Sequence, residues 1–170
     1  LEAVAKAANW TPSPAPSGRG FGVACGLDAG TYVAHAAEVT VDESTGEVQV
    51  ERMVCAQEMG IVVNPDGATM QMEGCLTMGP GYALLEHIRF PSGDILDRNF
   101  HTYRIPRFSD LPEIETVLVE NNELDPQGGG EPAIVSIGAV IANAIYDACG
   151  SRVFTMPFTP ESVRAGIPAG

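Results

Sequence analysis

The chain has 170 residues, of which 45% are hydrophobic and 18% charged, a composition typical of one compact domain or a piece of a larger one. Nine Lys and Arg against 22 Asp and Glu give a formal net charge of −13. Nucleic acids and anionic membrane surfaces are bound by clusters of cationic side chains, so this acidic composition argues against both. The apolar runs are shorter than the roughly 20 residues of a membrane-spanning helix.

The first 17 residues predict a short helix followed by a linker. Apolar residues recur at helical spacing over residues 1–9, and the Pro-rich run 11–18 cannot hold a helix. We therefore divide the chain into 1–17 and a single unit, 18–170. Because the chain begins at Leu1 without an initiator Met or a signal-like segment, we expect an excised or processed fragment of a longer protein, with cytoplasmic and periplasmic locations both open.

Three strands are predicted next, Phe21–Leu27, Tyr32–Val41 and Glu47–Ala56, because these runs are rich in Val and Ala. The loop Asp42–Gly46 has the composition of a hairpin connection between the last two. Apolar and polar residues alternate on both sides of this loop, which predicts that one face of the hairpin is solvated.

A helix is predicted to begin at Asn64 and Pro65, residue types typical of an N-cap and a first helical position, and to run to Glu86. It contains several glycines, each of which costs about 1 kcal/mol relative to Ala. We therefore expect something to pack closely against its backbone. Four apolar residues are expected to form the core stripe of this helix: Met70, Met78, Leu84 and Leu85.

The rest of the chain predicts a second hairpin, a strand and two helices. The segments are His87–Phe90 with Ile95–Asp97, Ile114–Glu120, Pro132–Cys149 ending at Gly150, and a last short helix capped by Thr159. The basic stretch Tyr103–Phe108 is interpreted as an ion-pairing loop or as a seam against another chain. Together these elements predict an α+β fold with mixed or antiparallel strands and packed helices.

The cysteines and histidines do not form a metal-binding pattern. Neither CxxC nor a Cys/His pair at ligand spacing occurs, so we predict no metal ligands on this chain. We expect the four cysteines to be buried free thiols.

The glycine run Gly128, Gly129 and Gly130, followed by Glu131 and Pro132, is the most informative motif. It is either a flexible loop that ends in an N-terminal proline, or a carboxylate held against a ligand that the glycines admit. The spacing also fits a loose dinucleotide-binding fingerprint. That match is weak, because Glu131 would face the pyrophosphate.

A second motif, Gln71-Met72-Glu73-Gly74, lies in the glycine-rich helix. Gln71 is either a solvent-facing residue or an amide donor to an oxo or phosphate group in a pocket. The pattern by itself leaves both interpretations open.

The order of these motifs resembles the C-terminal part of the molybdenum-binding large subunit of the xanthine oxidase/aldehyde oxidase family, over about residues 18–165. Within the family the sequence is most similar to the isoquinoline 1-oxidoreductase β-subunit type. The collinear segments are Gly18–Ala24, Gly30–Ala34, Glu38–Val41, Val63–Asp66, Gln71–Gly74, Asn99–Arg104, Gly130–Pro132 and Ala142–Ala148.

The resemblance implies a molybdenum hydroxylase that oxidises an aldehyde or an N-heteroaromatic carbon, with water as the oxygen source. Glu131 matches the family's general base, which acts on a molybdenum-bound hydroxyl. Gln71 matches a glutamine at the molybdopterin site, and Gly128, Gly129 and Gly130 would shape that site.

The resemblance also implies cofactors and partners. The cofactor would be molybdopterin with molybdenum, in its cytosine dinucleotide form, and [2Fe-2S] clusters would lie on a small partner subunit. The other cofactor-contacting segments belong to the remainder of the molybdenum subunit, so the isolated chain is expected to be inactive.

A second hypothesis is a non-catalytic assembly or scaffold domain that keeps the fold without the chemistry. The retained Glu131 favours the enzyme, because a relic has no reason to keep a carboxylate there. The sequence does not determine the substrate, the electron acceptor or the oligomeric state.

Overall fold

The computed structural model describes residues 1–10 and 17–168, so most of the predicted linker, 11–16, lies outside the described residues. Its centre is one four-stranded sheet with the strand order β1-β2-β3-β4. The first three strands are antiparallel neighbours, and the last is parallel to β3. The strands are β1 (Arg19–Asp28), β2 (Thr31–Val41), β3 (Val48–Glu58) and β4 (Glu113–Leu118). The predicted α+β class with a mixed sheet is confirmed.

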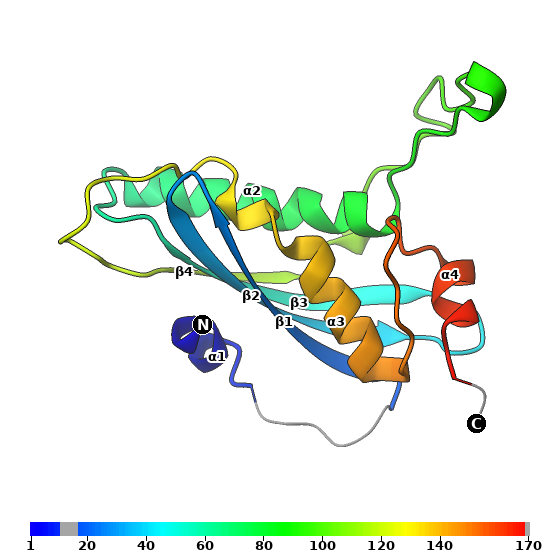
Figure 1. The fold of residues 1–170 in the computed structure, drawn as a ribbon, viewed down its shortest axis with the longest axis horizontal. Coiled ribbons are helices and arrows are strands. Elements are labelled where there is room, and N and C mark those ends of the chain that lie inside the picture. Colours follow the sequence, from blue (N-terminus) through cyan, green and yellow to red (C-terminus); the bar gives the residue numbers. More distant parts are fainter. Residues whose placement is uncertain (11–16, 169–170) are drawn as a thin grey trace.

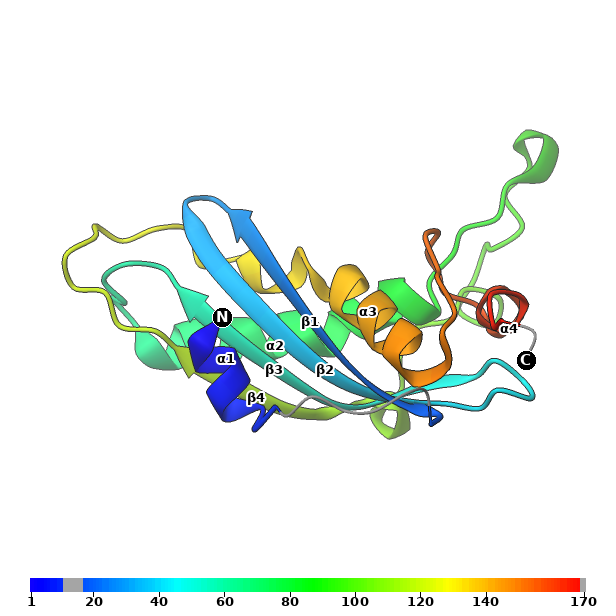
Figure 2. The ribbon, with the colours of Figure 1, turned by 60° about the horizontal axis from the view of Figure 1, so that its bottom comes forward.

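Helices lie on both faces of this sheet (Figures 1 and 2). On one face α2 packs over β3 and β4 and α3 packs over β1 and β2, while α1 packs on the other face. The helices are α1 (Glu2–Ala7), α2 (Pro65–Leu84), α3 (Ile137–Cys149) and α4 (Pro160–Ala165), with 3-10 turns η1 (Pro91–Gly93), η2 (Phe108–Asp110) and η3 (Pro132–Ile134). The boundary between 1–17 and 18–170 stays a prediction.

Successive residues of β2 point to opposite faces of the sheet. Ala37 and Val39 belong to the core under α2 and α3, whereas Ala34 and Ala36 belong to a smaller core under α1. The predicted solvated face is confirmed at the β2–β3 hairpin, where Glu47, Gln49 and Glu51 are exposed. Farther along the strands, at the centre of the sheet, α1 covers this face.

The start of α2 is confirmed: the side chain of Asn64 accepts a hydrogen bond from the backbone N–H of Gly67 at 3.0 Å. The predicted core stripe is wrong for Met70 and Met78, which are 70% and 58% exposed, while Met72 and Leu76 are fully buried. It is confirmed for Leu84, which packs against the core. Both sets have helical spacing, and only the position of the sheet selects the buried one.

Glycines allow α3 to lie directly on the edge strand β1. A Cβ atom on Gly22 would lie 2.1 Å from the carbonyl oxygen of Val140. The polar side chains of α3 also bond to the free edge of the strand: Asp147 accepts from the N–H of Phe21 at 2.9 Å, and Asn143 donates to the carbonyl of Val23 at 2.9 Å. The helix thereby covers an edge that would otherwise be open to another chain.

Residues 132–149 form an 18-residue segment that is apolar enough to cross a membrane by length and composition, which the apolar runs in the sequence did not predict. In this fold 61% of that segment is buried. Its hydropathy is that of a core helix, since Ile137, Ile141 and Ile145 are fully buried in the core that α3 shares with the sheet and α2.

Residues 85–112 form an arm whose part around η1 projects from the body (Figure 1), while Pro106 packs back against Gly81 of α2. The predicted hairpin within it is wrong: no strands form, and the arm is held by the ion pair between Arg89 and Asp97 at 2.6 Å. Two strands without a covering layer are marginally stable, which explains the irregular backbone. Among the described residues, Arg104 and Arg107 form no ion pair, so the ion-pairing interpretation of this stretch is not supported.

Candidate functional site

Glu131 lies at the end of the loop that follows β4, directly before the turn η3. It is exposed, and its side chain does not cap this turn. Its carboxylate also makes no hydrogen bond or ion pair to any described residue of the chain. The charge is therefore available to a ligand, and the helix-end interpretation of Glu131 finds no support in the contacts.

The glycine run before Glu131 is bonded to the turn between β1 and β2. The N–H of Gly128 donates to the carbonyl of Ala29 at 3.1 Å, and the hydroxyl of Thr31 donates to the carbonyl of Gly128 at 2.6 Å. Both backbone groups of Gly128, its N–H and its carbonyl, are therefore bonded within the chain. The interpretation as a free loop is therefore not supported.

One of the three glycines is required by the fold itself. A Cβ atom on Gly128 would lie 2.5 Å from the Cβ of Ala29, whereas one on Gly129 would meet the flexible end of Met59, whose Cε would lie 2.4 Å away. Gly130 instead has no atom within 4 Å of such a Cβ position. Of the run, only Gly130 leaves space for a ligand in this structure, and the cofactor role of all three stays a prediction.

Gln71 joins α2 to this run. Its Nε2 donates to the carbonyl oxygen of Gly130 at 2.6 Å, across 59 residues of sequence. The side chain is exposed, so its Oε1 and second N–H remain available. The structure thus brings the predicted residues Gln71, Gly130 and Glu131 to one place on the surface.

A thiol lies beside them. The Sγ of Cys75 lies 3.6 Å from the carbonyl oxygen of Gly130. Burial raises the pKa of the Cys75 thiol, the negative charge of Glu131 raises this pKa further, and the Gln71 amide opposes both. Cys75 is therefore a neutral thiol at pH 7, not a thiolate.

The prediction of buried thiols is confirmed for Cys55, Cys75 and Cys149 and is wrong for Cys25, which is exposed on the edge strand. Burial raises the pKa of Cys55 to about 12. Within residues 1–10 and 17–168, no three His, Cys, Asp or Glu side chains are placed to hold a metal ion together.

Two buried polar side chains near the site were not predicted from the sequence. His35 is fully buried on β2 and contacts the segment directly after Glu131, while Gln57 is fully buried on β3 beside Gly129. The Oε1 of Gln57 has no hydrogen-bond partner among the described residues. The available signal was a histidine within the predicted strand Tyr32–Val41 and a glutamine directly after the predicted strand Glu47–Ala56, because buried polar groups need partners.

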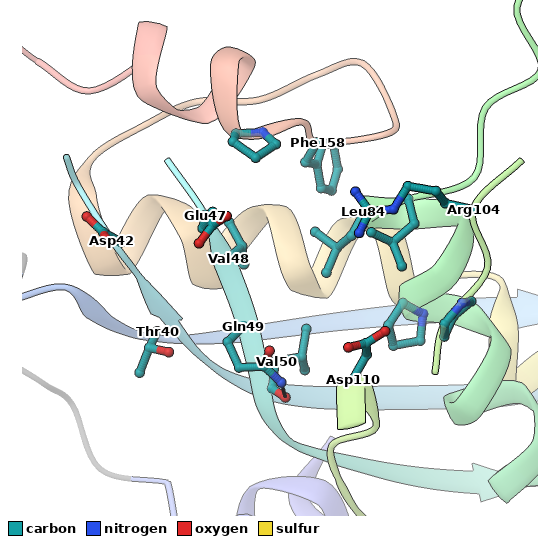
Figure 3. A pocket seen from close by; sticks show the side chains of 14 residues that line it. Thr40, Asp42, Glu47, Val48, Gln49, Val50, Leu84, Arg104, Asp110 and Phe158 are labelled. Carbon is teal, nitrogen blue, oxygen red and sulfur yellow. Dashed lines mark hydrogen bonds between the residues drawn. The ribbon is translucent and has the colours of Figure 1, made fainter. Parts of the chain in front are cut away.

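A pocket of about 430 Å³ lies at the opposite end of the sheet (Figure 3). Its walls come from the β2–β3 hairpin, the end of α2 and the arm, and they include Asp42, Glu47, Arg104 and Asp110. None of the predicted site residues lines it. The glycine run instead contacts Thr31, at the other end of β2 from Thr40 in the pocket wall.

A family model described as a molybdopterin cofactor-binding domain matches residues 4–112. One subunit of the nicotinate dehydrogenase of Pseudomonas putida is 33% identical over 98% of this chain and 15% of the relative. The β-subunit of isoquinoline 1-oxidoreductase of Brevundimonas diminuta is 32% identical over 94% of this chain and 21% of the relative.

The solved aldehyde oxidoreductase from Desulfovibrio desulfuricans ATCC 27774 matches with a TM-score of 0.72 and 33% identity, over 81% of this chain and 16% of that chain. The chain therefore spans between 15% and 21% of the length of these proteins. Relatives with different substrate names match at nearly equal identity, so the isoquinoline-type branch stays a prediction.

Proposed function

Because this chain belongs to the molybdopterin cofactor-binding domain family of xanthine oxidase-type molybdenum subunits, we propose that it is a fragment of a molybdenum hydroxylase with Glu131 as its general base. The observation that carries the proposal is the meeting of Gln71, Gly130 and Glu131. A hydrogen bond of 2.6 Å joins two motifs that lie 59 residues apart in the sequence.

The residues present fit a large polar cofactor. Gly74 on α2 and Gly130 both have open space where a side chain would stand, and the amide of Gln71, also on α2, bonds directly to Gly130. The free Oε1 and N–H of Gln71 can bond to an oxo, phosphate or pterin group. Gln71 and the backbone at Gly130 would therefore hold this chain's share of the molybdopterin site, with Gly128 and Gly129 shaping the loop behind it.

When bound, the cofactor supplies the two-electron oxidation. In the net reaction one C–H bond of the substrate becomes C–OH, with oxygen from water, and two electrons and two protons are released. Glu131 accepts one of these protons, which frees the oxygen to attack carbon. General-base catalysis of this kind contributes about 10²–10⁴-fold to the rate.

The substrate class that we propose is an aldehyde or an N-heteroaromatic compound. The names of the relatives include nicotinate, isoquinoline and aldehyde activities. Both classes contain an electron-poor carbon that an activated oxygen can attack. We further propose the cytosine dinucleotide form of molybdopterin and [2Fe-2S] clusters on a separate small subunit that receives the two electrons.

The remainder of the molybdenum subunit is the other partner of this chain. Glu131 is exposed here, whereas proton transfer in the proposed reaction needs a site closed to bulk water. We propose that the rest of the subunit covers this surface. The chain on its own would then be inactive.

The test uses the complete enzyme, assayed with nicotinate, isoquinoline and a simple aldehyde in ¹⁸O-labelled water. We expect molybdenum and pterin in the purified enzyme and ¹⁸O in the product. Absence of both molybdenum and pterin would support the scaffold domain instead.

The variant Glu131→Gln keeps the shape of the side chain and removes its basic oxygen. We expect normal molybdenum content and a loss of turnover of at least about a hundredfold. Glu123→Gln, which removes an exposed carboxylate from the same loop, is the matched control and should retain turnover. Near-normal turnover in fully metallated Glu131→Gln enzyme would refute the assignment.

A further inference from the structure

His35 connects the centre of the sheet to the segment that follows Glu131. Its Nε2 lies 2.9 Å from the carbonyl oxygen of Ala133, and its Nδ1 lies 2.7 Å from the hydroxyl of Ser136. These partners are 98 and 101 residues away in the sequence. The ring is completely buried, so water cannot replace either bond.

The partners define the direction of both bonds. A carbonyl oxygen only accepts, so the Nε2 of His35 carries the proton and donates to Ala133. Burial lowers the pKa of His35 to about 4, so the ring is neutral at pH 7 and its Nδ1 accepts from the hydroxyl of Ser136. One neutral ring therefore satisfies a carbonyl and a hydroxyl of the same short segment.

Ser136 gives up its usual local role to make this contact. It is the N-cap residue of α3, yet its side chain makes no capping hydrogen bond. An N-cap serine normally bonds to the helix's own N–H groups, which stabilises the helix. Here the hydroxyl bonds to His35 on β2 instead, so a tertiary contact replaces the usual local capping bond.

Further side chains hold the same backbone. Tyr82 donates its hydroxyl to the carbonyl of Ile134 at 2.8 Å, and Gln71 donates to the carbonyl of Gly130 at 2.6 Å. Glu131 thus lies between carbonyl groups that are fixed from α2 and from β2. Gln71 and Tyr82 lie on α2, whereas His35 lies on β2 and connects this segment to the sheet.

We propose that His35 is a positioning residue, which holds the turn after Glu131 through Ala133 and Ser136 so that the carboxylate stays in one place. The proposal rests on the proposed function of Glu131. A glycine precedes Glu131, and glycine leaves the backbone free to move. A general base must be held within about 0.5 Å of its working position, and a displacement of about 1 Å can cost about a hundredfold in rate.

The test uses the complete, molybdenum-loaded enzyme with the variant His35→Gln. The glutamine amide keeps a donor near the position of Nε2 and loses the acceptor for Ser136. We expect unchanged molybdenum and pterin content, hydrogen exchange at least about tenfold faster across residues 131–136, and kcat lower by about tenfold or more, with little change in KM.

A second variant, Ser136→Ala, removes the other partner and keeps the bond to Ala133. We expect the same changes on a smaller scale, about threefold in kcat. Ser151→Ala is the matched control, because the buried hydroxyl of Ser151 bonds to the carbonyl of Val163 at 2.7 Å, beyond the far end of α3. It should leave exchange across residues 131–136 unchanged.

The double variant separates positioning from general stability. If His35 acts through Glu131, then His35→Gln causes no further loss of turnover in a Glu131→Gln background. An equal loss in both backgrounds would overturn the proposal, and so would unchanged exchange across residues 131–136. If Glu131→Gln alone retains full turnover, the proposed function fails, while the exchange data still decide whether His35 holds the turn.

Discussion

The contact between α3 and β1 allows a stability prediction worked from single atoms. In Gly22→Ala, the new Cβ would lie 2.1 Å from the carbonyl oxygen of Val140 and 2.6 Å from the backbone nitrogen of Ala144. Ordinary contacts of carbon are about 3.5 Å, so the helix would have to move by more than about 1 Å. Both neighbours are backbone atoms, which cannot rotate away as a side chain can.

Overpacking of a core costs about 1–3 kcal/mol, and we expect the upper end of this range because α3 must move as a body. A loss of about 3 kcal/mol makes local opening about 150 times more frequent. The assay is hydrogen exchange of peptides from α3, measured by mass spectrometry in the complete subunit. Their exchange should be faster by about that factor in Gly22→Ala.

Gly138→Ala is the matched control on α3 itself. There the new Cβ would lie 2.7 Å from the sulfur of Met156, the flexible end of a side chain. Alanine is a better helix former than glycine by about 1 kcal/mol, so exchange in α3 should be unchanged or slower. If Gly22→Ala leaves α3 exchange within about twofold of the parent, the direct helix–strand contact is refuted.

Three further predictions concern the site and its surroundings. Gln71→Ala in the complete enzyme should lower molybdenum occupancy or turnover. The protein should stay folded, because Gly130 is exposed and water can replace the lost donor. Unchanged metal content and activity would show that Gln71 is an ordinary surface residue. The isolated chain should bind no stoichiometric molybdenum by elemental analysis, and should self-associate in ultracentrifugation through exposed side chains such as Phe108 and Phe154, 94% and 88% exposed. Burial lowers the pKa of His35 from 6.5 to about 4, so the unfolded chain binds this proton more tightly than the folded chain does. Stability should therefore fall by up to about 3 kcal/mol as the pH drops from 6.5 to 4, with no further loss from His35 below that. Denaturation at several pH values should show a weaker dependence over this window in His35→Gln.

The elements that the sequence predicted correctly depend on interactions within a few residues. Asn64 caps α2, Thr159 caps α4, and Gly150 ends α3 in a left-handed conformation, all as predicted. Each of these signals is a side-chain-to-backbone bond or a backbone preference that a short segment makes by itself. No distant partner is needed to form it.

The failed predictions depend on what covers an element. Met70 and Met72 are both apolar residues of α2, and the sheet buries only Met72. The segments 87–90 and 95–97 have strand-like composition, but without a covering layer they form an irregular arm. Residue composition and hydrophobic periodicity do not show where a neighbouring helix or sheet will pack. The sequence therefore could not predict which face of α2 is buried or whether the arm forms strands.

For the candidate site, the order of the motifs identified the family and predicted the chemical groups, namely Glu131, Gln71 and the glycine run. How these groups are held follows from tertiary contacts. The bond from Gln71 to Gly130 and the anchoring of the next turn by His35 connect residues between 59 and 101 positions apart. Such contacts exist only after β2 has paired in the sheet and α2 and α3 have packed on it, because sheet register and helix packing, not local preference, bring these atoms within hydrogen-bond distance.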